Sequence, residues 1–242
     1  MTDKRKKGIE LLAAGDYSAA LTIFNDLLLS GENDWALLHD MGSCLRYLNK
    51  YEQAISFFHQ SLLNMPEDES AQNKYTVYLS LGIAFQLYEE YENSVIALKT
   101  GISISEEIVY PHWLLFNSLG MTYSHMGEEQ NALESYLKAK DSILSFTTSL
   151  DKPISNNFTK ELDKKVGGKG LMLNLDKGYS ILKSNPDFCI ILNNIGGSYI
   201  ELGDLQSAED ALSEAIEYIP EGFDYPVPQQ GLEYIKELKE KL

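Results

Sequence analysis

Small and large apolar residues recur at fixed distances along most of the chain. Each copy of the pattern has a glycine, then a large apolar residue three positions later and a small residue twelve positions later. A second large residue follows sixteen positions after the glycine, and in every copy but the first a second small residue follows nineteen positions after it. The glycines that begin the copies are Gly8, Gly42, Gly82, Gly120 and Gly196. Because spacings of three and four share one helix face, each copy predicts two amphipathic helices joined by a turn.

The small residues have a structural purpose in this interpretation. In the last copy, Gly196 lies on the first helix and Ala208 on the second, so the two backbones can approach closely while Leu212 fills the space beside them. The turns lie at residues 15–17, 49–51, 89–91, 127–129 and 203–205. Glycines in these turns are expected to take the left-handed conformation that ends a helix. One pair leaves an apolar face uncovered, so the pairs are expected to stack.

The pattern resembles the tetratricopeptide repeat family, whose signature is W-x2-L-G-x2-Y followed by A-x3-F, A and P. The last copy matches it at Gly196, Tyr199, Ala208, Ala215 and Pro220. The five clear repeats cover residues 1–34, 35–68, 75–108, 113–146 and 189–222. The resemblance implies an all-α, right-handed superhelical solenoid of antiparallel helix pairs, with a single domain over residues 1–242.

Two segments fall outside the clear repeats. The distance from Gly120 to Gly196 is twice that from Gly82 to Gly120, which predicts a degenerate repeat over residues 147–188. A flexible insertion is the alternative. Residues 229–242 place leucine and isoleucine on one stripe with lysines opposite, and they predict a C-terminal capping helix over the last apolar face.

The charge of the chain bears on its partners. The formal net charge is −16, and residues 184–235 contain no lysine or arginine. Such a surface repels phosphate backbones, so we expect no nucleic-acid binding, whereas a basic protein partner would be attracted. No apolar run is long enough to span a bilayer, and two cysteines within apolar helical patterns favour free thiols. We therefore expect a cytoplasmic protein without membrane insertion.

No arrangement of residues indicates catalysis. The four histidines do not occur at the spacing of a metal site, and His39 and Cys44 point apart on a helix. The glycine-containing segment 165–170 lacks the spacing of a phosphate-binding loop. We expect neither a catalytic residue nor a metal or other cofactor.

Candidate ligand-binding residues lie on the first helix of each repeat, away from the packing face. The resemblance places this face in a concave groove, and polar side chains alternate there with apolar ones. The candidates are His39, Arg46, Tyr47, Ser80, Gln86, Asn117, Met121, His125, Asn193 and Asn194. An asparagine amide both donates and accepts hydrogen bonds, so it can pair with the backbone of a bound peptide. The alternative is that Asn193 and Asn194 satisfy local helix ends or each other.

The sequence favours a non-enzymatic scaffold or adaptor that binds a peptide segment of a partner protein in the groove. An acidic chaperone or peptide-sensing regulator of the same family is the alternative. Some family members hold chaperone carboxyl termini with a clamp rich in lysine and arginine. The matching positions here are Arg5, Ile9, Asp40, Thr76 and Ser80, and Asp40 would repel a terminal carboxylate, so this ligand class is not expected. An enzyme with a pocket near residues 145–188 is a third hypothesis. The partner and the oligomeric state stay open.

Overall fold

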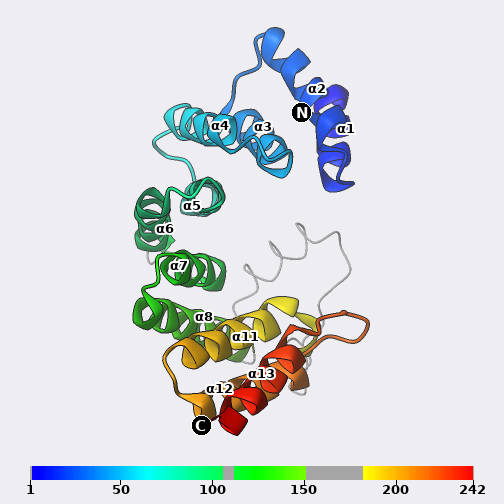
Figure 1. Cartoon of the computed structure of the whole chain (residues 1–242). Helices are drawn as coiled ribbons and strands as arrows, with labels where there is room; N and C mark the ends of the chain where they lie inside the picture. The colour runs from blue at the N-terminus through cyan, green and yellow to red at the C-terminus, as the bar shows by residue number, and fades with distance from the viewer. Residues whose placement is uncertain (1, 106–111, 151–181, 242) are drawn as a thin grey trace. The chain divides into compact units, whose positions relative to one another are not determined.

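The computed structural model of the chain describes residues 2–105, 112–150 and 182–241, and every regular element within these ranges is a helix. The N-terminal helices are α1 (Asp3–Ala13), α2 (Tyr17–Leu29), α3 (Trp35–Tyr47), α4 (Tyr51–Leu63), α5 (Ala71–Leu87) and α6 (Tyr91–Ser105). The later helices are α7 (Trp113–His125), α8 (Glu129–Leu150), α11 (Pro186–Glu201), α12 (Leu205–Glu217) and α13 (Val227–Lys241). Successive helices pack in pairs (Figure 1), which confirms the predicted all-α fold.

The chain divides into two compact units, residues 1–110 and 111–242, and each is described by itself. In the first unit α1 packs with α2, α3 with α4 and α5 with α6, and successive pairs are joined through α2–α3 and α4–α5 contacts. In the second unit α7 packs with α8 and α11 with α12, and α13 contacts both α11 and α12. None of the described helices combines the length and the apolar run that a bilayer span requires.

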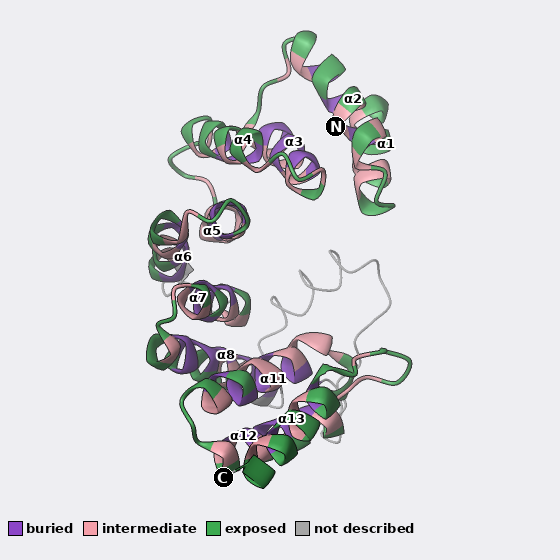
Figure 2. Ribbon diagram, viewed as in Figure 1, coloured by how far each residue is buried: buried purple, intermediate pink, exposed green. Residues whose placement is uncertain are grey.

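A close approach between paired helices explains the repeated glycine. A Cβ atom placed on Gly120 would lie 2.5 Å from Cε1 of the Tyr136 ring, well inside van der Waals contact. The same relation joins Gly8 to Phe24, Gly42 to Phe58, Gly82 to Leu98 and Gly196 to Leu212. These large partners are buried within the pairs (Figure 2). The pattern of small and large residues therefore determines how closely the two helices of each pair pack; we call this pattern of glycine and large partner the packing code.

The turn within a pair ends one helix and begins the next. Gly203 has a φ of 80°, and the amide that follows it, on Asp204, donates to the Tyr199 carbonyl at 2.9 Å. The Asp204 carboxylate then accepts from the Ser207 amide at 3.1 Å and caps α12. Asn49 and Glu89 take the left-handed conformation in turns that lack glycine, with φ values of 59° and 63°.

Helix α11 packs directly on α8 in the second unit. Ala132 and Tyr136 of α8 share a buried cluster with Ile191 and Ile195 of α11. Among the described helices, the pair α11–α12 thus follows the pair α7–α8 in the stack. The degenerate repeat that the sequence predicts over 147–188 falls mostly on residues outside those described, and α8 itself continues to Leu150.

Helix α13 covers the last pair, at the place where the capping helix is expected. Ile235 is 1% exposed and shares a buried cluster with Ala208 and Leu212 of α12. The side of α12 that would otherwise receive a further repeat is thereby covered.

Candidate functional site

Two candidate residues of the first unit connect neighbouring first helices. Nε2 of His39 on α3 lies 3.0 Å from the hydroxyl of Ser80 on α5. Both residues are half-buried, and the His39 ring packs 5.5 Å from the ring of Phe58. The structure thus brings together two residues that are 41 positions apart and that the sequence assigned to one face.

Arg46 and Tyr47 form a stack at the end of α3. The Arg46 guanidinium lies 4.1 Å from the centre of the Tyr47 ring, close enough for a cation–π interaction. The opposite partner of Tyr47 is Tyr17, the first residue of α2, whose ring is 4.4 Å away and nearly parallel at 7°. Sequence reasoning missed Tyr17, although a tyrosine recurs at the same place after the turns, as Tyr51 and Tyr91.

Asparagines connect the first helices of the second unit. Nδ2 of Asn194 on α11 donates to Oδ1 of Asn117 on α7 at 3.0 Å, and Asn117 Nδ2 contacts the Met121 sulfur at 3.8 Å. Asn194 therefore pairs with a neighbouring repeat, and neither with Asn193 nor with a helix end. Asn117, Asn193 and Asn194 are all half-buried. No described residue bonds the Oδ1 atom of Asn194, so this amide keeps an acceptor for a ligand.

The remaining candidates differ in their exposure. Met121 is 38% exposed, and His125 is also exposed at the end of α7. Gln86, in contrast, is only 8% exposed, so little of its side chain can meet a ligand. The residues at the same place in other repeats, Arg46 and Ser124, are half-buried as well. The assignment of this position to an open face from the sequence therefore overestimates its exposure.

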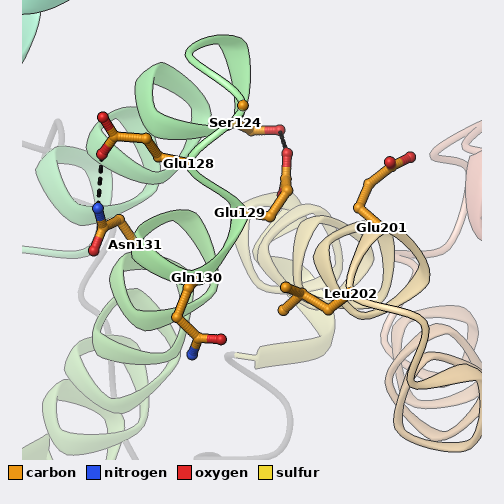
Figure 3. A pocket seen from close by; sticks show the side chains of 8 residues that line it. Ser124, Glu128, Glu129, Gln130, Asn131, Glu201 and Leu202 are labelled. Atoms are coloured by element: carbon orange, nitrogen blue, oxygen red, sulfur yellow. Dashed lines mark hydrogen bonds between the residues drawn. The ribbon is translucent and has the colours of Figure 1, made fainter.

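A hollow that the sequence did not reveal lies at the turn between α7 and α8 (Figure 3). Its volume is about 860 Å³, and it also borders the end of α11. The residues that line it are Ser124, Gly127, Glu128, Glu129, Gln130, Asn131, Glu201 and Leu202. A smaller hollow of about 250 Å³ occupies the equivalent place in the first unit, between the turn after α3 and Tyr88 at the end of α5. Both hollows are formed by one turn and the first helix of the next repeat.

Glu129 determines the chemistry of the larger hollow. Its carboxylate accepts a hydrogen bond from the Ser124 hydroxyl at 2.8 Å and another from the Ser198 hydroxyl at 3.0 Å. Burial, and then the negative charge of Glu129, raise the pKa of the nearby Tyr136 above its ordinary value. Glu129 occupies the place of the tyrosine in the first three repeats, so a carboxylate replaces an aromatic ring here.

The chemical groups of the described residues suit binding by hydrogen bonds, ring contacts and charge. Nowhere in residues 2–105, 112–150 and 182–241 do three or more histidine, cysteine or acidic side chains gather as metal ligands would. Cys44 and Cys189 are free and buried. Hydrogen-bonding amides, stacked aromatic rings and carboxylates at the turns can hold a polypeptide, and this is the chemistry that the two units present.

Comparison with known sequences places the repeats in a family. Residues 37–71, 115–142 and 191–221 match sequence profiles described as tetratricopeptide repeat. The chain is 26% identical over 124 residues to the BBSome complex member BBS4 of Bos taurus, and 26% identical over 113 residues to BBS4 of Mus musculus. These matches cover 51% and 47% of the chain but only 22% and 20% of the relatives, so the match spans about a fifth of their length.

Solved structures share the fold. MamA of Desulfovibrio magneticus RS-1 superposes with a TM-score of 0.60 at 16% identity, over 90% of this chain and 96% of that one. A chain of the APC/C hetero-tetramer Cut9-Hcn1 gives a TM-score of 0.64 at 14% identity, over 98% of this chain and 36% of that one. The tetratricopeptide-like repeats of a putative kinesin light chain from Podosopora anserina give 0.61 at 11% identity, over 89% and 92%. The profile matches show tetratricopeptide repeats at residues 37–71, 115–142 and 191–221, and the structural similarities show that the chain has the fold of such repeats.

Proposed function

We propose that the chain is a non-enzymatic scaffold that binds a peptide segment of a partner protein along the first helices of its repeats. Tetratricopeptide repeat proteins generally act as protein-interaction scaffolds. Two of the similar proteins are named as parts of assemblies: BBS4 as a BBSome complex member and the APC/C chain as part of the Cut9-Hcn1 hetero-tetramer. These names describe those proteins, and for this chain they support an interaction role.

The observation that carries the proposal is the pairing of Asn117 with Asn194. The pair connects α7 to α11 on the face that the sequence assigned to ligand binding. Two exposed apolar side chains, Leu114 and Met121, each 38% exposed, lie on α7 on either side of Asn117 in the sequence. An extended peptide needs backbone hydrogen-bond partners and apolar contacts for its side chains, and this face supplies both.

We further propose that the partner segment carries a basic side chain. The hollow beside this face contains the carboxylates of Glu128, Glu129 and Glu201, and no described lysine or arginine lines it. Opposite charge accelerates association and fixes the register of a bound segment. We propose a reducing compartment, the cytoplasm, as the site of action, because both cysteines are free and buried. Imaging of the tagged chain tests this location.

Substitution of the two asparagines tests the scaffold proposal. Native lysate is passed over the immobilised wild-type chain, the Asn117→Ala/Asn194→Ala variant and an Asn25→Ala control, and captured proteins are quantified by mass spectrometry. Asn25 is an exposed asparagine on α2, a second helix. Each lost hydrogen bond is worth about 1 kcal/mol, so affinity should fall roughly fivefold per asparagine. Equal capture of the same proteins by all three folded chains would refute binding at this face.

A further inference from the structure

The two arginines of the chain have contrasting environments. Arg5 binds Asp34 through both terminal nitrogens, in the bidentate arrangement that suits a guanidinium and a carboxylate. Arg46 has no hydrogen bond or ion pair with any described residue, whereas the Nε atoms of both arginines are buried without a partner among the described residues.

The Arg46 guanidinium is held in place despite this lack of a counter-ion. It lies over the face of Tyr47, and Tyr47 stacks on Tyr17, so three planar groups form a ladder at the junction of repeats 1 and 2. The stack fixes the plane of the guanidinium in advance, which reduces the entropy that a ligand would have to remove. Tyr47 is 49% exposed, so the ladder is accessible to a ligand.

A purely structural role explains these features less well. Arg46 is in the last turn of α3, where a cation interacts favourably with the helix dipole. A lysine or a fully solvated arginine would supply that interaction equally well. Neither would require a stacked guanidinium with a buried nitrogen, since withdrawal from water is costly for an unpaired charge.

We propose that Arg46 binds a carboxylate of the partner segment, with the ring of Tyr47 supporting the guanidinium. The inference rests on the proposed function and adds a chemical requirement: the partner segment carries an acidic group where it meets the end of α3. A planar carboxylate matches the fork of the guanidinium and would accept from its terminal nitrogens, which bond no described residue. Asp34, the N-cap of the same helix, is bound to Arg5 and lies at the opposite end of α3 from Arg46.

Peptide arrays test this assignment. The full wild-type chain is first applied to an array of random dodecamer peptides with amidated ends. The affinity of each binding peptide is then measured by fluorescence anisotropy for four proteins: the wild type, Arg46→Gln, Arg46→Lys and a Lys50→Gln control. Lys50 is exposed, lies four residues from Arg46 and forms no side-chain cap bond. Lys50→Gln therefore removes the same positive charge as Arg46→Gln from a neighbouring position. A second array with free carboxyl ends distinguishes a side-chain carboxylate from a chain terminus.

We expect the binders to share an acidic position. Its replacement by the corresponding amide should weaken binding to the wild type and to Lys50→Gln at least tenfold, but to Arg46→Gln less than twofold. For Arg46→Lys the loss of affinity should lie between those of the wild type and Arg46→Gln, because lysine keeps the positive charge but lacks the planar, forked guanidinium. An equal loss on Arg46→Gln and the wild type, or binders without an acidic preference, would overturn the assignment and leave the scaffold proposal intact. The absence of any peptide binder would refute both.

Discussion

Gly196 and Gly197 are neighbours in α11 and allow the packing code to be tested with a built-in control. A Cβ atom on Gly196 would lie 2.6 Å from Cγ and 2.8 Å from Cδ2 of Leu212, whereas one on Gly197 would meet nothing within 4 Å. Both substitutions to alanine remove a glycine from the same helix, and each gains about 1 kcal/mol in helix propensity. The difference between the two variants therefore isolates the cost of the close approach.

The size of that cost follows from the surroundings of Leu212. Apolar carbons normally approach to about 3.5–4.0 Å, so roughly 1 Å must open between α11 and α12. Leu212 cannot withdraw, because it is 2% exposed and Gly231 of α13 confines its other side. Overpacking of this kind costs about 1–3 kcal/mol. We expect Gly197→Ala to raise the free energy of unfolding by about 1 kcal/mol, and Gly196→Ala to lie about 1–3 kcal/mol below it.

Thermal and urea unfolding followed by circular dichroism measure this difference. For a chain of this size, 1 kcal/mol corresponds to a shift of about 2–4 °C in Tm, so the two variants should differ by several degrees. Equal stabilities, or a more stable Gly196→Ala variant, would show that the pairs can separate at little cost. The repeated glycine would then need an explanation other than close packing.

Two further predictions concern ionisable groups. Burial raises the pKa of Asp34, but the hydrogen bonds from Arg5 and from the Leu37 amide outweigh it, and the net pKa is lowered. A lowered carboxyl pKa contributes stability that is present above the unfolded-state value near 4 and is lost as the pH falls through the folded value. Asp34→Asn retains the α3 cap, so it should lower the free energy of unfolding by no more than about 1 kcal/mol at pH 7. The difference from the wild type, measured by urea unfolding, should shrink progressively below pH 4. Burial raises the pKa of the Cys44 thiol to about 12 and also raises that of Cys189. Neither cysteine should therefore react with iodoacetamide at pH 8 until the chain unfolds. Fast labelling of the native chain would contradict this prediction.

The framework was predictable because its rules are local. Each glycine and its large partner are sixteen residues apart, as Gly42 and Phe58 are, so one short window of sequence contains both sides of the contact. The turns are equally local, although Glu89 shows that a left-handed residue need not be a glycine. The pairing of Asn117 with Asn194 was not predictable, because it spans 77 residues and depends on α11 packing against α8. The burial of Gln86, which is 8% exposed, was also missed by the assignment of helix faces from the sequence.

The division between framework and variable positions also indicates where binding specificity can arise. A residue such as Gly120 cannot change without displacing Tyr136, so the framework constrains every repeat alike. The first residue of the second helix in each pair differs between repeats. It is Tyr17, which stacks on Tyr47 beneath Arg46, in the first repeat, and Glu129, which lines the hollow at the end of α7, in the fourth. One structural position therefore supplies an aromatic support for a cation in the first unit and a carboxylate in the second. If the proposed binding holds, this position would let different repeats recognise groups of different chemistry.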